Sequence, residues 1–253
     1  MLKKWKMTYP AYTGEEERRV YVYVPDEAKK HPDRRYPVLY MFDGHNVFYD
    51  RDATYGKSWG MKKYMDRTRT PVIIAAVECN HAPCGARLSE YAPFSFDCSY
   101  GEITGRGDET VQWLLGTFKP MIDKEFPTLP DRANTYIAGS SMGGLMSLYA
   151  ITAYNRYFKG AACLSPSVWF APKALDACIR TSEIAPDTVV YMDYGAYEMP
   201  NHRGMQRRLS KVATALFAKR VDLTFRIVPD GTHSEASWEK QIPYFMKTLF
   251  YEA

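Results

Sequence analysis

The sequence has few cysteines and no long apolar segment. Five of its 253 residues are cysteine, an odd number, so they cannot all pair within the chain. This excludes a scaffold in which every cysteine is paired and favours free thiols in a reducing cytoplasm, with a disulfide between two of them as the alternative for an exported protein. No apolar run is long enough to cross a bilayer, and no apolar run follows the charged N-terminal residues as in a secretory signal. We therefore expect a cytoplasmic protein with no membrane partner.

Blocks of like charge are also missing. Lysine and arginine number 33 and aspartate and glutamate 29, which gives a net charge of +4 spread along the chain in small groups. No basic stripe is available to bind nucleic acid, so no nucleic-acid partner is expected. The sequence also lacks repeats and Gly/Ser-rich linkers, and it predicts one domain over residues 1–253. It does not specify an oligomeric state.

What the sequence does contain is an alternation of short apolar runs with longer amphipathic stretches. This alternation is typical of a βαβ protein. Strands are predicted at residues 19–24, 38–42, 72–77, 135–138, 160–164, 189–192 and 223–228. Helices are predicted at about 109–125, 142–155, 172–182, 201–220 and 235–251. The continuous apolar runs at 38–42 and 72–77 suit central parallel strands covered on both faces.

Residues 78–108 show no clear period and form a long connection. Such a connection in a compact domain is usually functional, as a lid or a pocket wall. The alternative is a surface excursion with its own packing. We expect this long loop to lie near the active site.

The motif Gly139-Ser140-Ser141-Met142-Gly143 follows a predicted strand and opens a predicted helix. In the pattern G-x-S-x-G the middle serine occupies a tight strand-to-helix turn, where flanking glycines allow close backbone approach. The following helix directs its N-terminal amides at the reacting carbonyl. This context predicts Ser141 as a nucleophile of an α/β-hydrolase fold.

A serine nucleophile needs a general base, most often histidine. The chain has five histidines: His31, His45, His81, His202 and His233. In the α/β-hydrolase order the acid follows the serine, and the histidine follows the last strand. His233 fits this place, whereas His202 opens a helix beside Arg203, where a solvated role is expected.

The acid of the triad should follow the strand at 189–192 and orient the histidine. Asp193 stands at the end of this strand, where a buried structural role is the alternative to a catalytic one. Glu198 lies further out, past a glycine. Position alone does not separate the two carboxylates.

Two backbone amides should stabilise the oxyanion of the tetrahedral intermediate. One is the amide of Met142, directly after the nucleophile. The other should come from the loop after an earlier strand, where Asp43-Gly44 permits a tight turn and the His45 amide is the candidate donor. Three indoles follow strand ends or the motif and are predicted to line the substrate pocket, with core packing as the alternative: Trp59, Trp169 and Trp238.

At this point the chain resembles the putative esterase family, which includes esterase D, feruloyl and acetylxylan esterases, and siderophore trilactone esterases. The similarity spans nearly the whole chain. The matching elements are YMFDGHN at 40–46, RLSEY at 87–91, GSSMGG at 139–144 and LSPSVW at 164–169.

The resemblance implies several properties of the chain. The family carries its acid in a glycine-x-x-Asp/Glu motif, which Gly195-Ala196-Tyr197-Glu198 is similar to, so Glu198 is preferred over Asp193. Many members have aspartate there, and the oxyanion loop often reads His-Gly where this chain has Asp43-Gly44. The implied fold is an α/β-hydrolase with a mostly parallel sheet, helices on both faces and no cofactor.

The expected reaction is hydrolysis of a carboxylic ester through an acyl-serine intermediate. The resemblance implies a small-molecule or oligosaccharide ester as substrate, with feruloyl or acetyl esters of carbohydrate first and siderophore lactones or S-formylglutathione behind them. One alternative is an acyltransferase with the same triad. Another, from a different class, is a non-catalytic binding protein with the hydrolase fold.

Residues Cys79, His81 and Cys84, with Cys98 further on, resemble a cluster of metal ligands, and free thiols are the alternative. Zinc ligands usually have tighter, paired spacings. Free thiols are the better interpretation, and no metal is expected.

Overall fold

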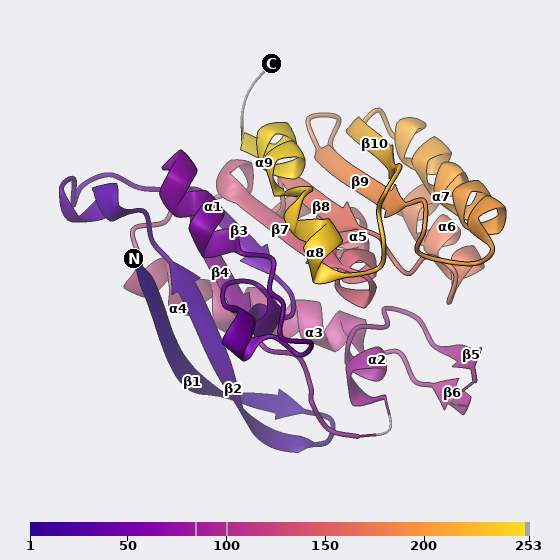
Figure 1. The fold of residues 1–253 in the computed structure, drawn as a ribbon, viewed down its shortest axis with the longest axis horizontal. Coiled ribbons are helices and arrows are strands. Elements are labelled where there is room, and N and C mark those ends of the chain that lie inside the picture. The colour runs from indigo at the N-terminus through magenta and orange to yellow at the C-terminus, as the bar shows by residue number, and fades with distance from the viewer. Residues whose placement is uncertain (84, 100, 251–253) are drawn as a thin grey trace.

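The computed structural model describes residues 1–83, 85–99 and 101–250. Eight strands form one sheet in the order β1-β2-β4-β3-β7-β8-β9-β10 (Figure 1). Their bounds are β1 Leu2–Ala11, β2 Gly14–Tyr23, β3 Val38–Met41, β4 Ile73–Val77, β7 Thr135–Ser140, β8 Gly160–Leu164, β9 Val189–Gly195 and β10 Asp222–Val228. The strands from β4 to β10 pair in parallel, whereas β1 with β2 and β2 with β4 pair antiparallel. The sheet is therefore mostly parallel, as expected.

Helices cover both faces of this sheet (Figure 1). On one face lie α3 Gly107–Trp113, α4 Lys119–Glu125, α5 Met142–Ala153, α6 Pro172–Thr181 and α7 His202–Phe217. On the other lie α1 Met61–Thr68, α8 Glu235–Glu239 and α9 Ile242–Phe250. Strand residues alternate between the two layers: Val38 and Tyr40 face the first, and Leu39 and Met41 face the second. This three-layer arrangement is the α/β-hydrolase architecture that the motif requires.

Short helical turns connect several of these elements. The 3-10 turns are η1 Asp26–Lys29, η2 Gly44–Asn46, η3 Asp50–Asp52, η5 Arg132–Asn134 and η6 Asn155–Tyr157, and η4 Leu114–Phe118 is a π-helical turn.

Two predicted helices are each interrupted next to a proline. The helix expected at 109–125 consists of α3, the π turn η4 and α4, and Pro120 follows that turn. The helix expected at 235–251 is divided into α8 and α9, with Pro243 as the second residue of α9. Because proline lacks an N–H group and crowds the preceding turn, it is tolerated at a helix start but disrupts a helix interior.

The segment 78–108 is not structureless. It contains α2 Ala86–Glu90 and a small hairpin of β5 Phe96–Cys98 and β6 Gly101–Ile103. A buried ion pair anchors α2 to β2, with Arg18 Nη2 2.6 Å from Glu90 Oε2, and the same guanidinium covers the ring of Tyr9. The elements of this segment are short and bury apolar residues at irregular intervals, such as Tyr91, Phe96 and Ile103, so its sequence shows no regular apolar period.

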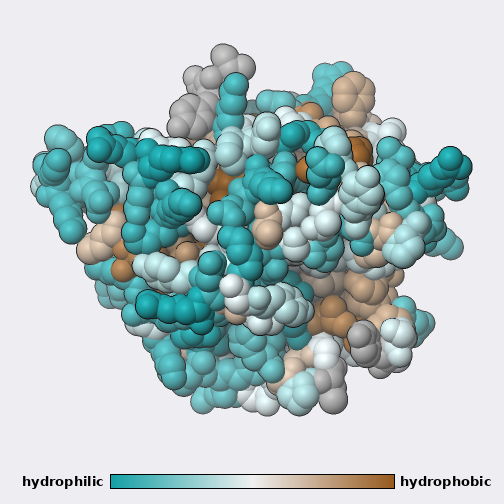
Figure 2. Space-filling view, in the orientation of Figure 1, coloured by the Kyte–Doolittle hydropathy of each residue, from teal (hydrophilic) through white to brown (hydrophobic). Residues whose placement is uncertain are grey.

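The surface in the orientation of Figure 2 is largely hydrophilic, with apolar side chains in small areas between polar ones. In the part of the chain that the structure describes, no helix combines the length and apolar character needed to span a membrane.

Candidate active site

The loops after β3, β4, β7 and β10 meet at one edge of the sheet, because parallel strands direct their carboxyl ends to the same side. They line a cavity of about 580 Å³. Its wall includes His45, Cys79, His81, Ser141 and His233. Residues from distant parts of the sequence thus face one common space.

Ser141 occupies the sharp turn between β7 and α5. Its φ and ψ are 57° and −120°, a backbone conformation that residues other than glycine rarely adopt. The turn depends on flanking glycines, because a Cβ on Gly139 would lie 2.6 Å from the carbonyl carbon of Gly143. The strand, tight turn and helix that the motif predicts are therefore present, and Ser141 lies on the cavity wall.

His233 bridges Ser141 and Glu198. Its Nε2 lies 2.9 Å from Ser141 Oγ, and its Nδ1 lies 2.9 Å from Glu198 Oε2. A carboxylate only accepts hydrogen bonds, so Nδ1 carries the proton and Nε2 accepts the bond from the serine hydroxyl. The imidazole is thereby held in the tautomer that a general base requires.

The Glu198 carboxylate is buried and fully bonded. Its side chain is 1% exposed. The second oxygen, Oε1, accepts bonds from the Gly195 amide at 2.6 Å and from Ser165 Oγ at 2.5 Å. These donors fix the carboxylate plane and leave Oε2 for His233.

Asp193 is buried, and its hydrogen-bond partners do not include His233. It accepts bonds from the Ser165 amide at 3.1 Å and the Tyr191 hydroxyl at 2.9 Å. Burial raises the pKa of Asp193 to about 7, although these two bonds act in the opposite direction. Of the two carboxylates that position left open, Glu198 is the one beside His233.

Two glycines bring the Glu198 and His233 loops together. A Cβ on Gly195 would lie 2.5 Å from the carbonyl carbon of Gly231, and a Cβ on Gly231 would lie 2.6 Å from the Cα of Gly195. The Tyr197 amide also donates to the Gly231 carbonyl at 2.8 Å. This backbone contact sets the separation of the carboxylate and the imidazole.

The loop after β3 packs closely against the sheet and α5. Asp43 has a φ of 56°, and a Cβ on Gly44 would lie 2.8 Å from the Val77 amide nitrogen. Arg87 donates two bonds of 2.7 Å to the Asp43 carboxylate. Burial opposes ionisation of this carboxyl, yet the Arg87 guanidinium holds the pKa of Asp43 below its usual value.

This packing places the two candidate oxyanion donors in first turns. His45 belongs to the first turn of η2, and Met142 is the first residue of α5. Amides in the first turn of a helix have no partner within it.

The three indoles occupy different environments. Trp238 lines the cavity, with its ring centroid 5.1 Å from that of His233, and its Nε1 donates to Ser165 Oγ at 2.9 Å. Trp59 instead packs in the core against Trp238, with ring centroids 6.0 Å apart. Trp169 borders a separate depression beside Met205 of α7. The prediction that all three line the pocket is therefore corrected for Trp59, which is buried in the core before α1, and for Trp169, which borders the other depression.

Sequence reasoning missed two residues that organise the site. Ser165 bonds to both Glu198 and Trp238, and Arg87 holds Asp43. Both lie in motifs that carry the family resemblance, LSPSVW and RLSEY, and Ser165 has a φ of 44°. The motifs were the available signal, but neither spacing nor composition assigns a role within them.

Cys79 and His81 lie close to His45, which comes from a different loop. One possible ligand atom of each residue lies within 4.8 Å of the other two. Cys84, considered with them in the sequence, falls outside the described residues, and Cys98 is not part of this group. The group combines residues from two loops, so the spacing of residues within one loop does not reveal it.

The sheet order and the helices on both of its faces define an α/β-hydrolase fold. The model of a family described as "Putative esterase" matches residues 12–249. The chain therefore belongs to this family of ester hydrolases.

Individual relatives are distant. The uncharacterized protein YbbA of Bacillus subtilis (strain 168) is 24% identical over 181 residues, which cover 70% of this chain and 67% of that protein. A ferulic acid esterase superposes with a TM-score of 0.70 at 17% identity over 98% of both chains. The enterobactin and salmochelin hydrolase IroE gives a TM-score of 0.67 at 19% identity, over 99% of this chain and 96% of that one. At these identities the structures show a shared fold.

Proposed function

We propose that this protein is a serine carboxylic ester hydrolase with Ser141 as nucleophile, His233 as general base and acid, and Glu198 as the orienting carboxylate. The observation that carries the proposal is the pair of 2.9 Å contacts by which the His233 ring bridges Ser141 Oγ and Glu198 Oε2. A buried carboxylate, an imidazole in the required tautomer and a serine on a cavity wall form a nucleophile–base–orienter chain.

In the first half of the reaction, Ser141 Oγ attacks the ester carbonyl while its proton passes to His233 Nε2. The amides of Met142 and His45 bind the resulting oxyanion. When the C–O bond of the alcohol breaks, His233 returns the proton to the leaving oxygen, and an acyl-serine remains. Glu198 stabilises the charge on the imidazolium in both steps.

In the second half, His233 takes a proton from water, and the hydroxide attacks the acyl-serine. Collapse of the second tetrahedral intermediate releases the carboxylic acid and returns the proton to Ser141. No cofactor is needed for either half, because the protein supplies every proton-transfer group.

For the substrate we propose feruloyl or acetyl esters of carbohydrate. The support is the fold shared with a ferulic acid esterase and the Trp238 indole on the cavity wall. The fold shared with an enterobactin and salmochelin hydrolase supports siderophore lactones as the second candidate. The odd number of cysteines supports a cytoplasmic location.

The test is Ser141→Ala, with the exposed Ser210→Ala on α7 as the matched control. Ser141→Ala should lower kcat for p-nitrophenyl acetate by at least about 10³-fold and abolish fluorophosphonate labelling, because the acyl-serine cannot form. Ser210→Ala should keep both properties. Labelling or turnover retained in Ser141→Ala would overturn the assignment.

A panel of feruloyl, acetyl and lactone substrates, each assayed with and without added sugar or alcohol, tests the substrate class. Free acid as the main product in the presence of acceptor supports hydrolysis. Transfer of most of the acyl group to the acceptor would instead identify an acyltransferase, and no labelling or turnover would identify a binding protein.

A further inference from the structure

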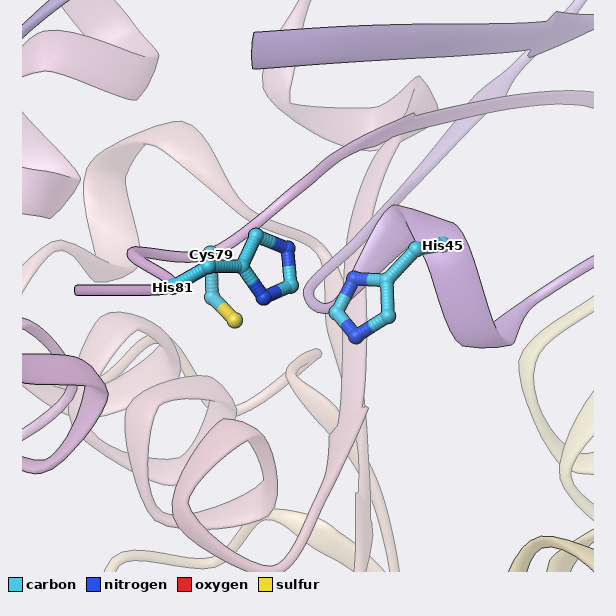
Figure 3. A group of neighbouring side chains, drawn as sticks. All are labelled: His45, Cys79 and His81. Carbon is cyan, nitrogen blue, oxygen red and sulfur yellow. The ribbon is translucent and has the colours of Figure 1, made fainter. Parts of the chain in front are cut away.

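A second cluster of reactive side chains lies on the wall of the Ser141 cavity. His45 comes from η2 after β3, and Cys79 and His81 come from the segment after β4 (Figure 3). One ligand atom of each lies within 4.8 Å of the others, and the two imidazole rings meet edge to face with centroids 4.7 Å apart. Figure 3 shows the thiol and the rings directed into the same space.

Each imidazole has one nitrogen beside an oxygen atom. His45 Nε2 lies 3.0 Å from Thr54 Oγ1, and His81 Nε2 lies 3.8 Å from Glu78 Oε1. The hydrogen bond of His45 to Thr54 has the arrangement of metal-binding histidines, in which an outer oxygen orients the ring and leaves the other nitrogen for the metal, whereas the Glu78 oxygen lies beyond hydrogen-bond distance of His81.

The remaining nitrogen of His45 is unusual. The His45 side chain is 97% buried (3% exposed), yet its Nδ1 has no hydrogen-bond partner among the described residues. A buried polar atom without a partner costs free energy and is rare. The Nδ1 atom of His45, which lies next to Cys79 and His81, is therefore available to coordinate a metal ion.

The donor set has a clear chemical preference. One thiolate and two imidazoles match the ligands of zinc sites, and three protein ligands leave the fourth tetrahedral position open. All three residues line the cavity, so this open position would face the same space as Ser141.

The surrounding charges are paired. The Asp43 carboxylate accepts a hydrogen bond from the Cys79 thiol and is bound by Arg87, and Glu78 is bound by Arg19. Two carboxylates and two guanidinium groups therefore surround the cluster, and neither sign dominates.

We propose that His45 Nδ1, Cys79 Sγ and the second ring nitrogen of His81 form a binding site for Zn²⁺ in the wall of the active-site cavity. On binding, the S–H bond of Cys79 breaks, a sulfur–zinc bond forms, and the proton passes to solvent. This site is independent of the proposed function, since none of its three ligand atoms takes part in the ester reaction.

The experiment measures metal binding directly on the full chain. Purified protein is stripped with a chelator, loaded with Zn²⁺ or Co²⁺ and desalted. We expect one equivalent of retained zinc by mass spectrometry and a thiolate-to-cobalt charge-transfer band in the Co²⁺ protein. Competition with a chromophoric chelator gives the Kd.

Cys79→Ser and His81→Ala should each weaken zinc binding by at least about 100-fold, and Thr54→Val by about 10-fold, because loss of a ligand exceeds loss of an outer partner. The matched controls are Cys98→Ser and the exposed His31→Ala, which should bind as the parent does. His81 is half exposed, so His81→Ala tests the site even where Cys79→Ser fails to fold.

No retained metal in the parent, or equal affinity in the parent and His81→Ala, would overturn the proposal. Fluorophosphonate labelling of the same samples separates this result from the esterase proposal. Labelled protein without zinc binding contradicts the metal site alone, and zinc binding without labelling contradicts the serine mechanism alone.

Discussion

At the scale of single residues, the carboxylates of Asp193 in β9 and of Glu198 just after it are both buried but have different partners. Glu198 accepts bonds from the Gly195 amide and Ser165 and contacts His233, whereas Asp193 contacts Tyr191 in the interior. Substitution of each by its amide therefore has a different expected effect.

Glu198→Gln should lower kcat for ester hydrolysis by about 10³–10⁴-fold with little change in fold. The amide NH₂ group would donate to Nδ1 and favour the tautomer in which Nε2 carries the proton, so His233 would not accept the proton of Ser141. Asp193→Asn is the matched control and should keep kcat within tenfold. Steady-state kinetics and circular dichroism measure both, and the reverse order of effects would make Asp193 the acid.

Asp193→Asn should change how stability depends on pH. The pKa of Asp193 is raised from 3.8 to about 7 in the folded protein, so between about pH 4 and 7 the folded state binds more protons than the unfolded state. The free energy of unfolding then falls as pH rises through this window, by on the order of 4 kcal/mol. Denaturant titrations at several pH values should show this fall in the parent and a smaller one in Asp193→Asn; identical slopes would contradict the raised pKa.

Sequence reasoning identified Ser141 and His233 because chain order and the elements around them constrain both positions. It did not separate Glu198 from Asp193 by position, because both side chains are buried and only their contacts differ: Glu198 meets His233, whereas Asp193 bonds to Tyr191. Sequence reasoning also could not identify the unpartnered Nδ1 atom of His45, because its surroundings arise from packing between two loops that are distant in sequence.

At the scale of elements, the contact between the loops after β9 and β10 is made by backbone atoms. Gly231→Ala would place a Cβ 2.6 Å from the Cα of Gly195, and neither backbone can move aside cheaply. We expect a loss of about 1–3 kcal/mol in the free energy of unfolding. Displacement of His233 should lower kcat by roughly 10²-fold.

The matched control is Gly116→Ala in η4, where a Cβ would meet no heavy atom within 4 Å. Alanine in a helical turn should leave kcat unchanged and raise stability by about 0.5–1 kcal/mol. Thermal unfolding and kinetics distinguish the two variants. Equal behaviour would show that the Gly195–Gly231 contact does not set the site geometry.

Elements with strong apolar runs were predicted well. The strands β3, β4, β8 and β10 lie within one residue of their expected bounds. The strand β1 was missed because its lysines give it the composition of an exposed tail, although it pairs with β2 along its full length. The helix α1 was missed because it is short and only Met61 and Met65 are buried.

At the scale of the whole molecule, both apolar layers share one sheet. Trp113 and Trp169 pack against the layer of α3–α7, and Trp59 and Trp238 belong to the layer of α1, α8 and α9. We propose that residues 1–253 form one domain, because unfolding either layer exposes one face of the shared strands.

Urea unfolding should therefore give a single transition with the same midpoint by every probe. The double variant Trp59→Phe/Trp238→Phe reports on the first layer by fluorescence, and Trp113→Phe/Trp169→Phe reports mainly on the second. After correction for the stability of each variant by circular dichroism, the fluorescence and dichroism midpoints should coincide. Separate midpoints would indicate two independently unfolding units.

His45 connects two sites through one residue. Its main chain belongs to the turn beside Ser141, and its imidazole faces Cys79 and His81. Thermodynamic linkage then requires reciprocity: if zinc changes the affinity of an oxyanion-mimicking inhibitor by some factor, that inhibitor changes the affinity for zinc by the same factor. A measured coupling in one direction would give the free energy that the η2 turn transmits between metal and substrate.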